Sequence, residues 1–237
     1  MIDSIYNIYV STIVKYNDAE LITNLPVVID TLEQLTTTVF INTNVESHKI
    51  LINKLNDGIA SNNTTAYQLA CISILHVIVS HCSYNTYHTH YINWYHSLMK
   101  LCKIYSNTSQ SISICVLQCV YNVMQYGCMW PDVRRDIYSG MVHKYISELI
   151  NVVHIVNNQT ISAKRNDQLI QLLTIMFGCI ASFQSSIRGS IPSIDELCYK
   201  LIVSGNNFIQ QVCTTRLIYI QYMNMYYIMM STLMRVI

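Results

Sequence analysis

The stretch TTAYQLACISILHVIVSHC, residues 64–82, decides the fold of this chain. Its apolar residues recur at three- and four-residue spacing, which predicts a helix. No Asp, Glu, Lys or Arg occurs between Asp57 and Lys100, so the stretch at first resembles a membrane span. A bilayer span needs about 20 largely apolar residues, whereas the strongly apolar part here runs only over residues 69–79 and contains His76. The pattern therefore favours a helix buried inside a helical protein.

Helical periodicity continues along the rest of the chain. We predict helices at residues 3–16, 27–40, 45–59, 65–82, 87–105, 110–126, 132–156, 167–183, 194–203 and from 208 onward. The breaks between them are polar or proline-containing turns, such as NLP at 24–26, SNNTT at 61–65 and WPD at 130–132. No segment alternates with a period of two, so no strand is predicted.

Pairs of helices recur about every 40–45 residues, which is the period of HEAT and armadillo units. We therefore predict an all-α fold, a HEAT/armadillo-like right-handed helical solenoid that forms a single domain over residues 1–237. Residues 1–60 would supply N-terminal helices, 61–217 the repeat core and 218–237 a terminal helix. The middle helices of such a stack contact neighbours on most sides, which accounts for an uncharged helix at 64–82.

The composition indicates a surface that is poor in charge. Only 11% of the residues are charged and 51% are hydrophobic, so much of the surface is expected to be covered by partners. The net charge of +1 argues against a protein that binds a nucleic-acid backbone, since such proteins usually carry a basic face. The only local basic pairs are Arg134 with Arg135 and Lys164 with Arg165.

The nine cysteines are an odd number in a chain of 237 residues, which does not resemble the disulfide framework of a short secreted protein. Most fall within apolar runs, as free cysteines do when they serve as small core residues: Cys71, Cys82, Cys102, Cys115, Cys119, Cys179 and Cys213. The N-terminus contains Asp3 and no basic segment, so no secretory signal is predicted. A cytosolic or nuclear location is expected.

Two kinds of chemistry have weak signals in the sequence. A metal site could involve residues close in sequence, namely His76, His81, Cys82, His88 and His90, or the pair Cys115 and Cys119. Structural zinc normally uses two tight ligand pairs, however, and no Cys-x-x-Cys is present. No nucleophile signature or phosphate-binding glycine loop occurs either. We therefore predict no metal, no cofactor, no small-molecule ligand and no enzymatic activity.

The two tryptophans are expected to differ in role. Trp94 lies on an apolar stripe and is expected to fill the core. Trp130 stands at a helix entrance beside Arg134 and Arg135, and Trp and Arg lead interface hot spots. These three residues are the candidate partner-binding site, with a solvated helix start as the alternative. The segment 217–237 is uncharged until Arg235 and could be a last solenoid helix or a tail anchor.

The order of the predicted helices resembles that of a known family. Residues 52–101, with Trp94-Tyr95-His96-Ser97-Leu98, resemble the N-terminal helical domain of the Rix-type pre-rRNA-processing proteins, whose animal members are the PELP-like proteins. The helix VRRDIYSGMVHKYISELINVV at 133–153 is similar to a later helix of that domain. Residues 169–217, with Ile209-Gln210-Gln211-Val212-Cys213, are similar to its closing element.

The resemblance implies a nuclear scaffold in ribosome biogenesis, located in the nucleolus and nucleoplasm. Members of that family bind a WD-repeat protein and a second helical-repeat protein, and the complex docks on the pre-60S particle with a giant AAA ATPase. It supports spacer processing of pre-rRNA. Such a protein would act through protein-protein contacts, with no membrane association and a possible homodimer. The alternative is a helical-repeat adaptor in nuclear import or vesicle transport.

Overall fold

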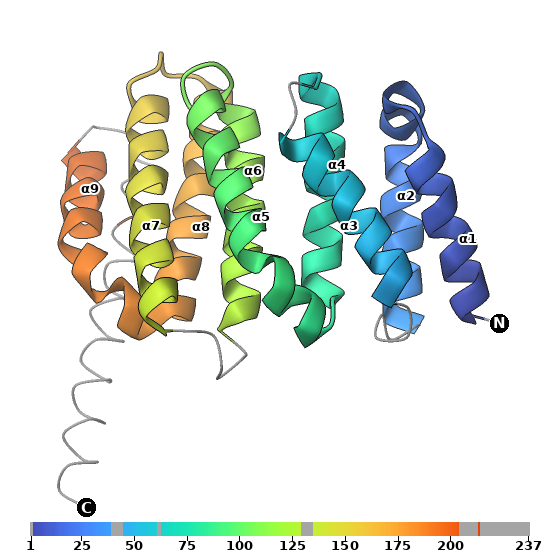
Figure 1. Cartoon of the computed structure of the whole chain (residues 1–237). Helices are drawn as coiled ribbons and strands as arrows, with labels where there is room; N and C mark the ends of the chain where they lie inside the picture. The colour runs from blue at the N-terminus through green and yellow to red at the C-terminus, as the bar shows by residue number, and fades with distance from the viewer. Residues whose placement is uncertain (1, 39–44, 61–62, 129–134, 204–212, 214–237) are drawn as a thin grey trace, which may run out of the picture. The chain divides into compact units, whose positions relative to one another are not determined.

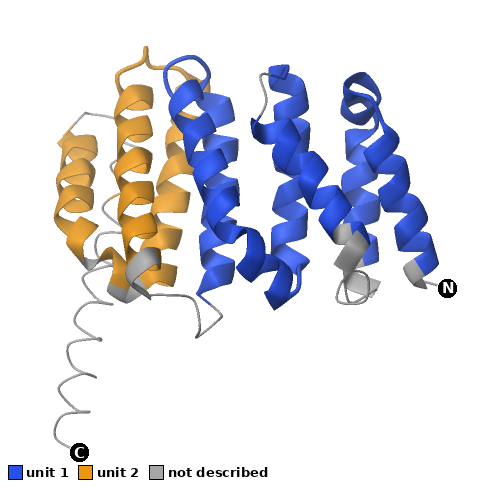
Figure 2. Cartoon of the chain, viewed as in Figure 1, with its two compact units in different colours: residues 1–134 blue, residues 135–237 orange. Residues whose placement is uncertain are grey.

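The computed structural model describes residues 2–38, 45–60, 63–128, 135–203 and 213 of the chain. Within these ranges every regular element is helical, so the expected all-α fold is confirmed (Figure 1). The chain divides into two compact units, residues 1–134 and residues 135–237 (Figure 2). Each unit buries apolar side chains of its own.

The first unit is a double row of helices. Its described helices are α1 (Ile2–Lys15), α2 (Asp18–Thr38), α3 (Val45–Ala60), α4 (Thr65–His81), α5 (Tyr84–Tyr105) and α6 (Gln110–Gly127). α3 contacts both α1 and α5, whereas α4 contacts both α2 and α6. The odd-numbered helices therefore form one row and the even-numbered helices the other. The rows meet where α3 packs on α4 and α5 packs on α6.

α4 is the uncharged helix predicted from the sequence, and it is buried on most sides by α2, α3 and α6. Ile72, Leu75 and Val79 are at most 2% exposed. The side chain of Thr64 caps the helix by accepting a hydrogen bond from the amide of Tyr67. In the part of the chain that the structure describes, no helix is long and apolar enough to cross a membrane.

α5 carries the aromatic core of the first unit. It begins at Tyr84, three residues before the predicted start at Tyr87, because the hydroxyl of Ser83 accepts a hydrogen bond from the amide of Thr86 and so supplies a helix cap. Trp94 is 1% exposed, which confirms that it fills the core. Its ring packs edge-on against Tyr87 at a centroid distance of 6.4 Å.

α2 contradicts the predicted break at residues 24–26, since the helix runs from Asp18 through Pro26 to Thr38. A proline inside a helix costs about 3 kcal/mol. Leu21, Val28 and Leu32 lie on both sides of Pro26 and are at most 2% exposed. Burial of each such side chain contributes about 1.5–3 kcal/mol, so a continuous buried face outweighs the penalty of the exposed proline.

The second unit contains α7 (Arg135–Asn157), α8 (Ala163–Ile187), the short 3₁₀-helix η2 (Arg188–Ser190) and α9 (Ile191–Val203). α7 packs on α8, and η2 contacts both of them and α9. α8 is longer at both ends than the predicted helix at 167–183, and α9 starts three residues before the predicted residue 194. Pro192 therefore lies in the first turn of α9, where a missing amide hydrogen breaks no helical hydrogen bond.

Two predictions about organisation remain predictions. One is that residues 1–237 form a single helical-repeat domain. The other is the terminal helix at 218–237, which lies outside the described residues.

The cysteines are free thiols, and seven of the nine are buried. Cys115 corrects the sequence prediction, since it is exposed and is not a core residue. It lies on the outer stripe of α6 with the exposed Ser111 and the half-buried Asn122, whereas the core face of that helix contains Val116 and Cys119. Residues four apart on a helix lie on roughly the same face but not at the same depth, so Cys119 is buried while Cys115 is not.

Candidate functional site

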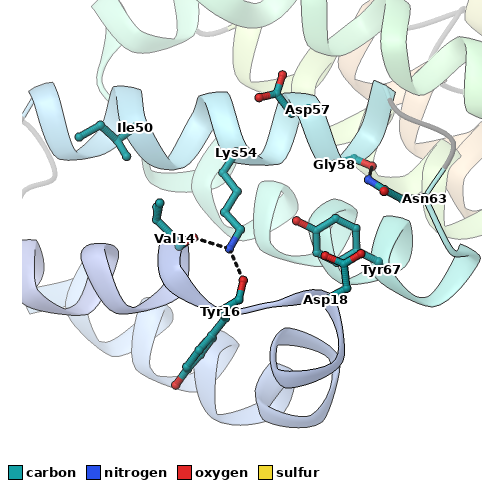
Figure 3. A pocket seen from close by; sticks show the side chains of 9 residues that line it. All are labelled: Val14, Tyr16, Asp18, Ile50, Lys54, Asp57, Gly58, Asn63 and Tyr67. Atoms are coloured by element: carbon teal, nitrogen blue, oxygen red, sulfur yellow. Dashed lines mark hydrogen bonds between the residues drawn. The ribbon is translucent and has the colours of Figure 1, made fainter.

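The candidate site is an open pocket in the first unit, where the turn between α1 and α2 meets α3 and the start of α4 (Figure 3). Its volume is about 510 Å³, within the range of small-molecule pockets. The lining residues are Val14, Tyr16, Asp18, Ile50, Lys54, Asp57, Gly58, Asn63 and Tyr67. The pocket therefore combines one amine, two carboxylates, an amide and two phenols.

The central side chain of the pocket is Lys54, which reaches from α3 to the C-terminal end of α1 (Figure 3). Its ammonium nitrogen Nζ lies 2.6 Å from the carbonyl oxygen of Ile13. It lies 2.8 Å from the carbonyl oxygens of Val14 and Tyr16. An ammonium has three N–H bonds, so all three are donated to carbonyls in the last turn of α1 and just beyond it.

This use of Lys54 argues against a catalytic amine. A lysine that acts as a nucleophile or base needs a free electron pair on nitrogen, whereas here the ammonium form is held by three carbonyl acceptors at the negative end of a helix dipole. Partial burial lowers the pKa of Lys54, because desolvation penalises the charged form, and the carboxylate of Asp18 opposes that shift. The geometry makes Lys54 a C-terminal cap for α1.

The floor of the pocket is a tight contact between α3 and α4 at Gly58. The Tyr67 hydroxyl and the Cys71 thiol share a hydrogen bond beside it. Burial raises the pKa of Cys71 to about 11 and that of Tyr67 to about 12. Both groups are therefore protonated at neutral pH, and Cys71 is not a reactive thiolate.

Glycine is required at position 58 because this contact has no space for a side chain. A Cβ atom added to it would lie 2.4 Å from Cys71 Sγ and 3.2 Å from Tyr67 Cε1. We expect Gly58→Ala to lower the free energy of unfolding by about 1–2 kcal/mol, because overpacking costs about 1–3 kcal/mol and exceeds the 0.5–1 kcal/mol by which Ala favours a helix over Gly. Urea unfolding of purified protein measures the change.

A matched control is available in α7, where a Cβ at the exposed Gly140 would meet no atom within 4 Å. Gly140→Ala should therefore raise stability by about 0.5–1 kcal/mol. Adding Cys71→Ala removes the 2.4 Å overlap, so the double variant of Gly58 and Cys71 should be more stable than the sum of the two single changes predicts. Stabilisation by Gly58→Ala alone would contradict the close contact.

The carboxylates of Asp18 and Asp57 give the pocket its charge. Both lie near the Tyr67 hydroxyl, where they contribute to its raised pKa. Asp18 and Asp57 are both exposed. The side-chain amide of Asn63 donates a hydrogen bond to the carbonyl oxygen of Gly58 at 3.3 Å. With Lys54 held by the end of α1, the two carboxylates are placed to accept a polar or cationic group from solution.

The histidines and cysteines considered as metal ligands are not gathered by the fold. His76 lies about 3 Å from the side-chain amide of Asn122 on α6, and His90 stacks on Trp94 at a centroid distance of 5.7 Å. Burial lowers the pKa of both imidazoles. Among the residues that the structure describes, no group of three or more His, Cys, Asp or Glu side chains could hold a metal ion.

The structure does not describe the side chains of the predicted partner-binding residues. Trp130 and Arg134 lie outside the described residues. Arg135 begins α7, but its side chain is not described. The pocket around Lys54 was missed by the sequence analysis. A weak signal existed, since Lys54 stands between the apolar Ile52 and Leu55 of α3, but the sequence does not say which helix end such a lysine caps.

In the ranges that the structure describes, the protein is all-helical, and its candidate site is the polar pocket around Lys54. No protein-family model, no curated protein and no solved structure matches this chain.

Proposed function

We propose that this protein is a HEAT/armadillo-like right-handed helical solenoid that acts as a non-enzymatic scaffold. The observation that carries the proposal is the double row of the first unit, in which α3 contacts α1 and α5 while α4 contacts α2 and α6. Helical repeats stack in this way, so that each repeat contacts only its neighbours and leaves long surfaces for partners.

The assembly that we propose is the one that matures the pre-60S particle and processes the spacers of pre-rRNA in the nucleus. The resemblance of residues 52–101 and 169–217 to the Rix-type and PELP-like proteins supports this choice. The partners would be a WD-repeat protein and a second helical-repeat protein, and contact with the pre-60S particle would be indirect. Trp130, Arg134 and Arg135 stay the proposed partner-binding residues.

The second candidate is a helical-repeat adaptor in nuclear import or vesicle transport. It is favoured by the charge of α2, which contains four carboxylates, at Asp18, Glu20, Asp30 and Glu33, and no Lys or Arg. α4, which packs on α2, and α6, which packs on α4, contain no Asp, Glu, Lys or Arg. An acidic helix beside uncharged helices would suit a basic cargo peptide.

Affinity purification of the tagged full chain, followed by mass spectrometry, tests the proposal. Recovery of large-subunit pre-ribosomal proteins with a WD-repeat protein is the expected result. A triple variant with Trp130→Ala, Arg134→Ala and Arg135→Ala should lose most of that recovery. A control with Lys100→Ala and Lys103→Ala, which removes two exposed cations from α5, should keep it.

Two outcomes would redirect the assignment. Recovery of cargo proteins with a small GTPase, or of coat subunits, would replace ribosome assembly by the adaptor function. Turnover of a substrate by the purified chain alone would overturn the scaffold itself, because a scaffold supplies surfaces and no reacting groups.

A further inference from the structure

Arg165 is a buried cation in the first turn of α8. Its side chain is 5% exposed, although arginine is rarely buried unless it is paired. Nη2 donates to the backbone carbonyl oxygen and to the side-chain oxygen of Asn157, each at 2.7 Å. The guanidinium is thereby held between the last residue of α7 and the start of α8.

The rest of this guanidinium has no acceptor among the residues that the structure describes. Nε and Nη1 are buried and make no hydrogen bond, and together they carry three N–H bonds. A buried donor without a partner costs about 1–3 kcal/mol, and more when it belongs to a charged group. No ion pair among the residues that the structure describes includes Arg165. Within the described part of the chain, the charge of Arg165 is therefore neither neutralised nor fully hydrogen-bonded.

The position of Arg165 in the first turn of α8 also disfavours its positive charge. The N-terminal end of a helix carries a partial positive charge, so acidic groups are favoured there and cations are not. α8 has no acidic residue in its first turn, and the exposed Lys164 adds a second cation beside Arg165. The first turn of this 25-residue helix thus has one buried and one exposed cation and no acidic residue, and a helix N-terminus favours anions.

We propose that the first turn of α8 is a binding site for a small oxyanion, which accepts hydrogen bonds from Nε and Nη1 of Arg165. Oxyanions suit the planar donors of a guanidinium. The anion could be a free inorganic phosphate or a carboxylate group, which share this chemistry. This site belongs to the second unit and is independent of the proposed scaffold function.

The turn above Arg165 provides a route for the anion. All five residues from Asn158 to Ser162 are exposed, and the side chain of Ile161 is 75% exposed. The turn is fastened to α7 by the amides of Asn158 and Gln159, which donate to the carbonyls of His154 and Val156. It is fastened to α8 by the carbonyl and hydroxyl oxygens of Ser162, which accept hydrogen bonds from the amides of Asn166 and Arg165. A segment with so few buried contacts opens at low cost, so a small anion can reach Arg165 without unfolding of the unit.

Thermal unfolding of the full chain tests the site, with inorganic phosphate, acetate and chloride compared at one ionic strength. Phosphate at about ten times its Kd should raise Tm by about 3–5 °C above chloride, because a ligand that binds only the folded state stabilises it. Arg165→Gln should abolish the rise, whereas Lys164→Gln, its neighbour on the exposed side, should keep most of it. A rise with acetate as well would identify a carboxylate as an acceptable ligand.

A second measurement covers the case in which Arg165→Gln does not fold. The ³¹P line of phosphate should broaden with wild-type protein and with Asn157→Ala, which leaves Nε and Nη1 in place. It should not broaden with Arg165→Lys, which keeps the charge and loses the planar set of donors. Equal effects on wild-type protein and both Arg165 variants would overturn the site, as would the lack of any response to phosphate and acetate.

Discussion

Trp94→Ala is expected to lower the free energy of unfolding by about 3–5 kcal/mol, the range measured for large aromatic residues removed from protein cores. Trp94 is 1% exposed, and its helix α5 contacts both α3 and α6. The indole packs against Tyr87 and His90. Truncation would leave a cavity between helices that the neighbouring rings cannot fill without moving.

Chemical denaturation with urea measures this effect, and Trp94→Phe is the matched variant. The indole Nε1 makes no hydrogen bond to any residue that the structure describes, so phenylalanine loses ring volume and no described polar contact. Its cost should be well below that of alanine. The exposed neighbour Asn93 supplies a control, since Asn93→Ala should change stability by less than about 0.5 kcal/mol. A loss below about 1 kcal/mol for Trp94→Ala would show that Trp94 does not fill the core.

Lys54→Met should be the second largest change, with a loss of about 2–3 kcal/mol. Methionine keeps the apolar stem of the side chain but removes the three hydrogen bonds to the carbonyls of Ile13, Val14 and Tyr16. Hydrogen bonds that involve a charged group contribute about 1.5–3 kcal/mol each. They are not additive here, because one ammonium makes all three and solvent at the open pocket can replace part of them.

Hydrogen exchange shows which helices lose stability in Lys54→Met. The amides of α1 should exchange faster in Lys54→Met than those of α6, because the lysine holds the C-terminal end of α1. Lys49→Met is the control, since Lys49 lies on the same helix and is exposed. Loss of protection spread evenly over the first unit, or an equal effect of Lys49→Met, would contradict the assignment of Lys54 as a helix cap.

The helices themselves could be predicted because their signals are local. In α4 the apolar residues repeat at helical spacing, and Thr64 stands where a cap is needed, so residues 65–81 were found almost to the residue. The predicted helix boundaries were wrong where a contact distant in sequence outweighed a local signal. Pro26 predicts a break, yet α2 continues through it because Leu21, Val28 and Leu32 share one buried face.

Local signals also do not predict how deeply a side chain is buried. The spacing of Cys115 and Cys119 places both on one side of α6, but only packing against α4 decides that Cys119 is covered and Cys115 is not. Arg165 is the opposite case. A basic residue beside a polar turn reads as exposed, and only the structure places it at 5% exposure with two nitrogens unpaired.

The sequence by itself determined that this protein is helical, that residues 64–82 form a buried helix and that Trp94 belongs to the core, since periodicity and capping act within a few residues. Only the tertiary structure decided the pocket, where Lys54 meets carbonyls about 40 residues earlier in the chain. It alone decided that Gly58 must be a glycine, because Cys71 occupies the space of a side chain there. Such contacts join segments whose separation in sequence carries no signal, so they follow from packing and not from any local pattern.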